Sequence, residues 1–161
     1  LGRLAKSEGM ALHAPPKPVN FSRLVRETAA ALFPLFEKQG RMLEAFIMDG
    51  LHCRCDPITM RELVINLLEN ALLHGKGTVR VSVLQKNGRI LMDVSDEGEG
   101  VPEMLRESML ERFRQRERNA PGSGLGLAIA RQTARNAGGS VAFISSSPCV
   151  LRLDIPKAAA E

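Results

Sequence analysis

The clearest pattern in the sequence is a β-hairpin, and this hairpin limits the kind of sheet that the chain can form. Residues 78–84 and 89–95 are rich in β-branched and apolar side chains, and Lys86-Asn87-Gly88 between them is typical of a tight turn. The strands of a hairpin pair in the antiparallel sense, and an antiparallel sheet leaves one face for helices to cover. The hairpin therefore favours a layer of helices on one side of a sheet.

Helical and extended segments alternate around this hairpin. Helices are expected at 21–39, 56–74 and 124–136, because apolar residues recur there at helical spacing, after a cap at Asn20 and before stops such as Gly75. Shorter strands are expected at 43–49 and 52–55, turning at Asp49-Gly50, and at 140–145 and 150–155. This alternation predicts a two-layer α/β sandwich in which a mixed, mostly antiparallel sheet is covered by three helices on one face.

The composition is that of a soluble globular domain. With 161 residues and 44% hydrophobic residues, the chain can bury one ordinary core. A net charge of +4 is compatible with nucleic acid, but Trp and Tyr are absent, and a small polyanionic ligand fits at least as well. No apolar run reaches the ~20 residues that span a bilayer, and no signal peptide opens the chain. We therefore expect a cytoplasmic domain with reduced cysteines that contacts neither nucleic acid nor the membrane.

Two segments differ in character from the rest of the chain. Ala14-Pro15-Pro16-Lys17-Pro18 stops any helix and is typical of a stiff linker, so 1–17 is expected to be the end of a helix and a linker, and 18–161 the domain. Residues 98–123 are rich in Arg, Glu and Gly and contain little that would form a core. Such a stretch between glycines is what a mobile lid needs, and we place the lid at about 101–122.

The helix expected at 56–74 carries polar residues along one side. Asn66 and Asn70 are four residues apart, so their amides project from the same side, and Glu62 extends this line by one turn. An amide oxygen is a suitable ligand for Mg²⁺, which keeps several waters and takes few protein ligands beside substrate phosphates. A solvated helix face explains the same spacing, so the pattern alone leaves both interpretations open.

An acidic residue among glycines follows the second strand of the hairpin. The carboxylate of Asp96 can accept a hydrogen bond from the exocyclic amine of adenine, and Gly98 and Gly100 leave room for the ring against the backbone. A tight acidic turn is the alternative, because acids and glycines are common in turns.

A glycine-rich segment, Gly122-Ser123-Gly124-Leu125-Gly126-Leu127, leads into the third helix. Unpaired backbone amides at a helix N-terminus can hold phosphates. The segment lacks the Lys-Ser or Lys-Thr of a P-loop and follows a loop, whereas a Rossmann fingerprint follows a strand. Arg112, Arg114, Arg116 and Arg118 precede it and can reach phosphate oxygens, although solubility of a loop also explains them.

Taken in order, these motifs resemble the sequence boxes of sensor histidine kinases. Residues 62–71 resemble the N box, 96–100 the G1 box, Glu111-Arg112-Phe113 the F box, and 122–127 the G2 box. From 18 to 156 the chain resembles their catalytic ATP-binding domain, in the superfamily shared with gyrase B, Hsp90 and MutL. Residues 1–9 also resemble the end of the second helix of the family's dimerisation domain, which agrees with a linker after it.

The resemblance implies a binding site for Mg²⁺ and ATP. Asn70 would coordinate the metal, Asn66 would lie beside the phosphates with Glu62 in support, and Asp96 would bind the adenine amine. Arg112 or Arg116 would approach the γ-phosphate. The other residues implied around the nucleotide are His74, Gly98, Gly100, Val101, Phe113, Ser123, Gly124, Leu125, Gly126 and Leu127.

The same resemblance implies a histidine kinase reaction. The γ-phosphoryl group would pass to a histidine on an upstream dimerisation domain of a homodimer, and then to the receiver domain of a response regulator. His13, His52 and His74 do not fit the phosphoacceptor, which lies on a helix before an acid, so the acceptor is expected upstream. The full-length protein would be anchored in the bacterial inner membrane.

Two alternatives and three departures qualify this interpretation. A non-catalytic ATP-sensing module has the same fold, and a DNA-handling ATPase of the gyrase or MutL kind is disfavoured by the F box and the compact lid.

The family usually has Lys or Arg at Leu73, Phe at Leu110, and a Gly-Thr pair near Ser147-Pro148-Cys149. None of these changes removes the expected magnesium or adenine ligand, so we expect nucleotide binding.

Overall fold

The structure is a computed structural model that describes residues 14–98 and 125–160. Its elements, in chain order, are β2 (Lys17–Asn20), α2 (Phe21–Lys38), β3 (Leu43–Ile47), β4 (His52–Cys55), α3 (Pro57–His74), β5 (Val79–Lys86), β6 (Arg89–Asp96), α5 (Leu125–Asn136), β7 (Ser140–Ser146) and β8 (Cys149–Pro156). None of the helices in these ranges is both long and apolar enough to cross a membrane.

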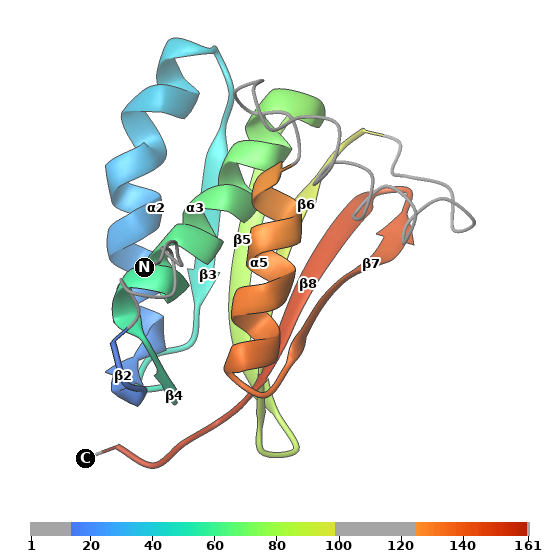
Figure 1. The fold of residues 1–161 in the computed structure, drawn as a ribbon. Helices are drawn as coiled ribbons and strands as arrows, with labels where there is room; N and C mark the ends of the chain where they lie inside the picture. Colours follow the sequence, from blue (N-terminus) through green and yellow to red (C-terminus); the bar gives the residue numbers. More distant parts are fainter. Residues whose placement is uncertain (1–13, 99–124, 161) are drawn as a thin grey trace, which may run out of the picture.

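A five-stranded sheet forms one layer, and helices form the other. The strand order is β3-β5-β6-β8-β7, with β3 and β5 parallel and the other neighbours antiparallel. Helices α2, α3 and α5 lie side by side on one face of this sheet (Figure 1). The predicted two-layer sandwich with a mixed, mostly antiparallel sheet is confirmed.

The two faces of the sheet differ because side chains alternate along each strand. In β5, Val79, Val81 and Val83 are buried under the helices, and Arg80 between them is exposed. The open face carries ion pairs between neighbouring strands: Glu44 with Arg80, Asp93 with Arg152, and Arg89 with Asp154. One covered face and one polar face are what an antiparallel sheet in a two-layer fold requires.

The predicted hairpin is present, and its turn explains two residues of the sequence. Strands β5 and β6 pair from Arg80 with Ser95 to Lys86 with Arg89. Asn87 has φ 52° and Gly88 has φ 76°, the left-handed conformations of a two-residue hairpin turn. Asn and Gly tolerate these angles better than other residues do.

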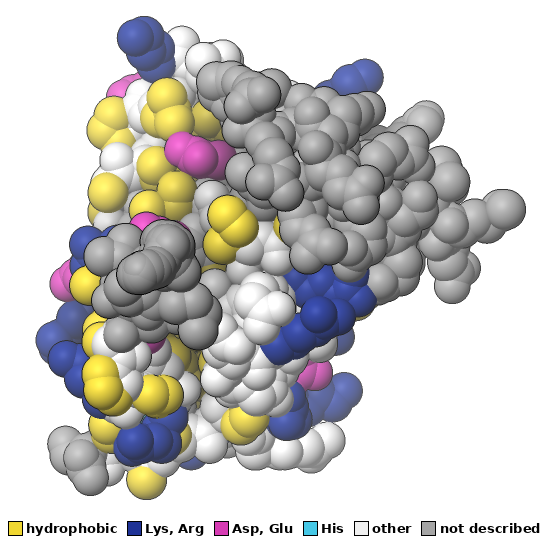
Figure 2. Space-filling model, viewed as in Figure 1, with side chains coloured by type: hydrophobic (Ala, Val, Ile, Leu, Met, Phe, Trp, Pro, Cys, Tyr) yellow, Lys and Arg dark blue, Asp and Glu magenta, His cyan; other side chains and the backbone are white. Residues whose placement is uncertain are grey.

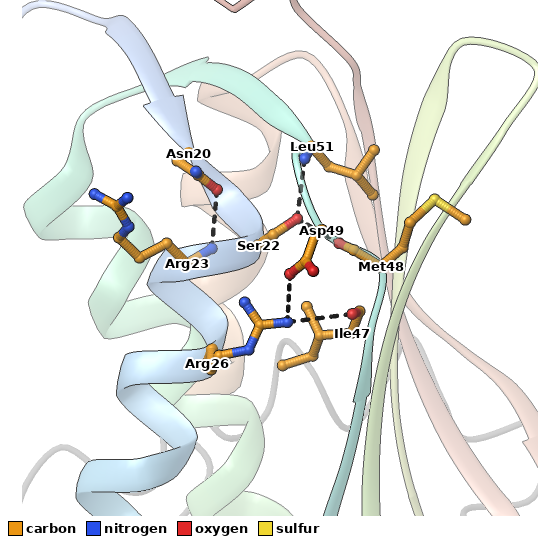
Figure 3. A network of polar contacts seen from close by, with 8 residues as sticks. All are labelled: Asn20, Ser22, Arg23, Arg26, Ile47, Met48, Asp49 and Leu51. Carbon is orange, nitrogen blue, oxygen red and sulfur yellow. Dashed lines mark hydrogen bonds and ion pairs between the residues drawn. The ribbon is translucent and has the colours of Figure 1, made fainter.

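The predicted turn at Asp49-Gly50 is present, but the strands on either side of it do not form a hairpin. Strand β3 pairs with β5, and β4 pairs with β2 in a separate two-stranded sheet, so the two segments do not pair with each other. The first turn of α2 holds the connection: Ser22 Oγ donates to Met48 O at 2.6 Å and accepts from Leu51 N at 3.0 Å (Figure 3). The loop therefore finds its hydrogen-bond partners on a helix.

Strand β2 lies at the end of the proline-rich segment, which did not predict it. Lys17 pairs with Cys55, and Ala14 N donates to Asp56 Oδ2 at 2.8 Å. Cys53 and Cys55 share the buried face of β4 as free thiols, as their alternate positions predict.

Helix α2 is amphipathic. Phe21, Val25 and Phe36 are completely buried. Hydrophobic side chains remain visible on the outer surface over α2 (Figure 2), where Phe33 is 45% and Leu35 is 37% exposed.

Candidate nucleotide site

Three of the predicted site residues lie at element ends that meet on one side of the molecule. Figure 1 shows the C-terminal ends of α3 and β6 and the N-terminal end of α5 together at the top of the view. Helices α3 and α5 also pack against each other. The fold therefore gathers His74, Asp96 and Leu125, which are far apart in the sequence, at one end.

Asp96 ends β6, and its side chain is only 7% exposed. Its Oδ1 accepts hydrogen bonds from Gly98 N at 2.7 Å and Lys76 N at 3.3 Å. Within the described ranges, no donor reaches Oδ2. A buried polar atom is normally paired, so this oxygen is suited to accept a hydrogen bond from a ligand such as the amine of adenine.

Two glycines pack directly against this carboxylate. A Cβ on Gly75 would lie 2.5 Å from Asp96 Oδ2, and a Cβ on Gly98 would lie 2.9 Å from Oδ1. Gly75 has φ −93°, which any residue adopts, so the requirement at this position is space. Glu97 N also donates to Lys76 O at 2.8 Å, which ties the turn after α3 to the turn after β6.

Helix α3 positions the predicted metal and phosphate residues. Asp56 caps its N-terminus by accepting from Ile58 N at 2.9 Å, and Pro57 occupies the first turn. Asn66 and Asn70 are half-buried, and Glu62 is exposed. The two amides are one helical turn apart, about 6 Å along the axis, so both can serve one bound group. Their roles remain predictions.

The departure near the C-terminus lies beside Asp96. Cys149 is the direct partner of Asp96 in the antiparallel ladder of β6 and β8. Direct partners place their side chains on the same face, with Cβ atoms about 4.5–5.5 Å apart. A half-buried thiol therefore lies beside the predicted adenine ligand, in the segment where the family usually has a Gly-Thr pair.

The remaining predicted residues fall into different settings. His74, the last residue of α3, and Leu73 are exposed. Helix α5 includes Leu125 and Gly126 at the first positions that the structure describes after residue 98. Leu127 is 2% exposed and belongs to the hydrophobic core, so its side chain packs among apolar neighbours.

Several predicted features lie outside the described residues. They are the lid at 101–122, the upstream helix, and the residues Gly100, Val101, Arg112, Phe113, Arg116, Ser123 and Gly124.

The sequence did not assign Gly75 and Lys76 to the site. It indicated only that glycines end the second helix, which Gly75 does by donating from its N to Ala71 O at 3.0 Å. Only the structure shows that Gly75 has backbone angles open to any residue, so that its lack of a side chain serves packing. The sequence alone carries no signal for this role.

Comparison with known proteins places this geometry in a family. Residues 55–159 match the model of the histidine kinase-, DNA gyrase B- and HSP90-like ATPases. The sensor-type histidine kinase PrrB of Mycobacterium bovis is 38% identical over 162 residues, which cover 96% of this chain and 34% of PrrB. The chain spans between 18% and 36% of the length of the curated relatives it matches.

Solved structures share the fold. The catalytic domain of the histidine kinase ThkA superposes with a TM-score of 0.77 at 21% identity, over 89% of this chain and 97% of that domain. ThkA has also been solved in complex with the response regulator protein TrrA. Full-length ShkA in complex with AMPPNP gives a TM-score of 0.76 at 25% identity, over 93% of this chain and 33% of ShkA.

Proposed function

Because the chain belongs to the family of histidine kinase-, DNA gyrase B- and HSP90-like ATPases, we propose that it is the ATP-binding catalytic domain of a sensor histidine kinase. The observation that carries the proposal is the carboxylate of Asp96. It is buried and fixed through Oδ1 by two backbone amides, and Oδ2 is proposed to accept a hydrogen bond from the ligand. An adenine amine supplies that donor, and Gly75 and Gly98 pack against the carboxylate where a side chain would collide with it.

The phosphate end of the nucleotide lies toward α3 and the start of α5 in this proposal. Asn70 coordinates Mg²⁺ through its amide oxygen, and Asn66 and Glu62 support the phosphates. The backbone amides of Leu125 and Gly126, with Gly124 before them, hold phosphate oxygens at the positive end of the α5 dipole. Mg²⁺ neutralises charge on the β- and γ-phosphates, which phosphoryl transfer needs from its site.

The proposed reaction passes the γ-phosphoryl group to a histidine outside this domain. The acceptor lies on an upstream dimerisation domain within a homodimer, and the receiver domain of a response regulator takes the group next. Residues 1–17 connect the two domains, and residues 101–122 form the lid, in which Phe113 is the anchor and Arg112 and Arg116 approach the γ-phosphate. The domain lies in the cytoplasm of a kinase anchored in the inner membrane.

Substitution of Asp96 tests the adenine site. Asp96→Asn replaces a charged acceptor by an amide, and a hydrogen bond to a charged group contributes about 1.5–3 kcal/mol, so affinity for ADP should fall about tenfold or more. Titration calorimetry on the 161-residue chain measures the change, with circular dichroism to show that the fold is kept. Unchanged affinity would refute the assigned adenine site.

Substitution of Asn70 tests the metal site separately. Asn70→Ala should remove the part of ATP affinity that depends on Mg²⁺ and leave the affinity measured in EDTA nearly unchanged. The variant serves as its own control, because the titrations with Mg²⁺ and with EDTA use the same protein. Equal losses with and without Mg²⁺ would contradict the metal role.

Leu73 favours a second candidate, a non-catalytic ATP-sensing module of the same fold. Leu73 is 54% exposed where the family usually has a basic residue, so one phosphate contact is absent at this position. Nucleotide binding does not separate the two candidates. Joining the chain to its upstream helices and assaying acid-labile phosphohistidine does, because a module that only senses ATP transfers nothing to an intact acceptor.

A further inference from the structure

The turn after α3, residues 75–77, is held from behind by a single arginine. Arg41 lies in the connection between α2 and β3 and donates to three backbone carbonyls: Nε to Gly77 O at 2.7 Å, Nη1 to Leu72 O at 2.8 Å, and Nη2 to Ala71 O at 3.4 Å. Its guanidinium thus joins the last turn of α3 to the residue that ends the following turn.

The chemistry of arginine suits this place. The last carbonyls of a helix have no partners within the helix and carry a partial negative charge. A planar guanidinium offers five donors in a fixed fork and can serve several carbonyls together, which the single ammonium of lysine does less well. Arg41 therefore donates to Leu72 O, adds a second donor to Ala71 O, which also accepts from Gly75 N, and fixes the direction in which the chain leaves the helix.

The backbone of Arg41 is itself firmly placed. Arg41 N donates to Phe36 O at 2.9 Å at the end of α2, and Val79 N donates to Met42 O at 2.9 Å at the start of β5. The guanidinium is therefore presented from a point that the helix layer and the sheet both fix.

The turn that Arg41 holds is the turn that contacts Asp96. Lys76 N donates to Asp96 Oδ1, and Lys76 O accepts from Glu97 N. Gly75 packs directly against the same carboxylate, because a Cβ there would lie 2.5 Å from Oδ2. A shift of residues 75–77 would therefore change both the hydrogen bonding and the surroundings of the carboxylate.

We infer that Arg41 is a positioning residue for adenine recognition, acting through the turn 75–77 on the carboxylate of Asp96. This inference rests on the proposed nucleotide-binding function. Arg41 itself touches main-chain carbonyls, so its contribution appears in how well the site distinguishes adenine from a base without the exocyclic amine.

The experiment compares binding of ADP with binding of IDP, whose base has a carbonyl in place of that amine. A site built to accept a hydrogen bond discriminates strongly against a ligand that lacks the donor. Arg41→Met keeps the unbranched apolar stem of the side chain and removes its donors, and the IDP-to-ADP ratio of dissociation constants should fall about threefold or more, because small displacements of a recognition group are costly. The ratio for Arg41→Lys should lie between the ratios for Arg41→Met and for the unsubstituted chain.

Arg26 provides a matched control. It also donates from a guanidinium to a main-chain carbonyl, Ile47 O at 3.3 Å, and pairs with Asp49 at 2.7 Å, but at the opposite end of β3 (Figure 3). Arg26→Met should leave the ratio unchanged. Asp96→Asn should abolish the preference, and adding Arg41→Met to it should change the ratio no further.

The outcomes separate the inference from the proposed function. A chain that binds ADP no better than IDP would overturn both. A clear ADP preference that survives in Arg41→Met, or in Arg41→Lys where Arg41→Met does not fold, would overturn the role of Arg41 alone. Equal weakening of ADP and IDP would also overturn it, because that result is what a purely structural arginine gives.

Discussion

At the scale of single residues, the carboxylate of Asp96, the proposed adenine ligand, is held by backbone groups and packed against glycines. Its Oδ1 accepts from two backbone amides, and a side chain on Gly75 would collide with Oδ2. Backbone donors cannot rotate away as side chains do, so the carboxylate is held in one orientation before a ligand arrives. Such prior ordering avoids part of the entropic cost of binding.

Gly75→Ala tests the space beside Asp96. The added methyl group would stand 2.5 Å from Oδ2, so the carboxylate or the turn must move, and affinity for ADP should fall about tenfold. Calorimetry gives the affinity. Gly98→Ala is a graded comparison, because its Cβ would lie 2.9 Å from Oδ1 and should cost less. A smaller loss for Gly75→Ala than for Gly98→Ala would contradict this account.

The cysteines report on the site through their reactivity. A hydrogen bond to Cys55 and burial both raise the pKa of the Cys53 thiol, so Cys53 stays protonated and slow to alkylate at pH 8. Cys149 is half-buried beside Asp96 and should react first with iodoacetamide, and ADP should slow that reaction. Peptide mass spectrometry identifies the labelled cysteine, with Cys53 as an internal reference. Equal labelling of Cys149 with and without ADP would argue against a nucleotide at this place.

At the scale of elements, α3 connects the proline-rich segment to the surroundings of Asp96. One carboxylate, that of Asp56, caps the helix through Oδ1 and accepts from Ala14 N through Oδ2. The other end of the same helix carries the turn that contacts Asp96. The position of α3 therefore depends on groups at both of its ends.

Asp56→Ala should destabilise the domain more than the equivalent change at the cap of α2. Loss of an N-cap costs about 0.5–2 kcal/mol, and Asp56→Ala also leaves the Ala14 amide without its acceptor. Asn20 caps α2 through one bond, to Arg23 N at 2.9 Å, so Asn20→Ala should cost only the cap. Urea unfolding measures the free energy of unfolding of both variants. Equal losses would show that the hydrogen bond from Ala14 to Asp56 contributes nothing to stability.

At the scale of the whole molecule, stability comes from the covered face of the sheet. Within residues 14–98 and 125–160, the core includes residues of every strand of the large sheet and of every helix. The open face carries ion pairs instead, and partly exposed pairs contribute little. Adjacent residues of one strand should therefore differ greatly in importance.

Leu153 and Arg152 are neighbours in β8 that test this difference. Leu153 is completely buried, so Leu153→Ala should lower the free energy of unfolding by about 2–5 kcal/mol. Arg152 pairs with Asp93 at 2.7 Å on the open face, and Arg152→Ala should cost about 1 kcal/mol or less. Urea unfolding of the two variants makes the comparison. Similar losses of unfolding free energy in the two variants would contradict the expectation that the covered face supplies most of the stability.

The features that the sequence determined are local. The turn at Asn87-Gly88, the cap at Asn20 and the helix after Pro57 follow from the conformations that these residues favour, so they are readable over a few positions. The order of helices and strands then limits the fold to a covered, mostly antiparallel sheet. The spacing of the motifs also predicted Asp96 as the adenine ligand, and the structure places this residue at the end of β6, where the strand itself fixes its position.

The partners of each segment were decided only by the tertiary structure. Strand β3 pairs with β5 and not with β4. An extended segment can pair with any free strand edge, and its own sequence does not specify which one. Arg41, Gly75 and Asp96 likewise meet only after the helix layer has closed on the sheet. Contacts between residues far apart in the chain depend on packing of the whole molecule, and packing of this kind leaves no local pattern in a single sequence.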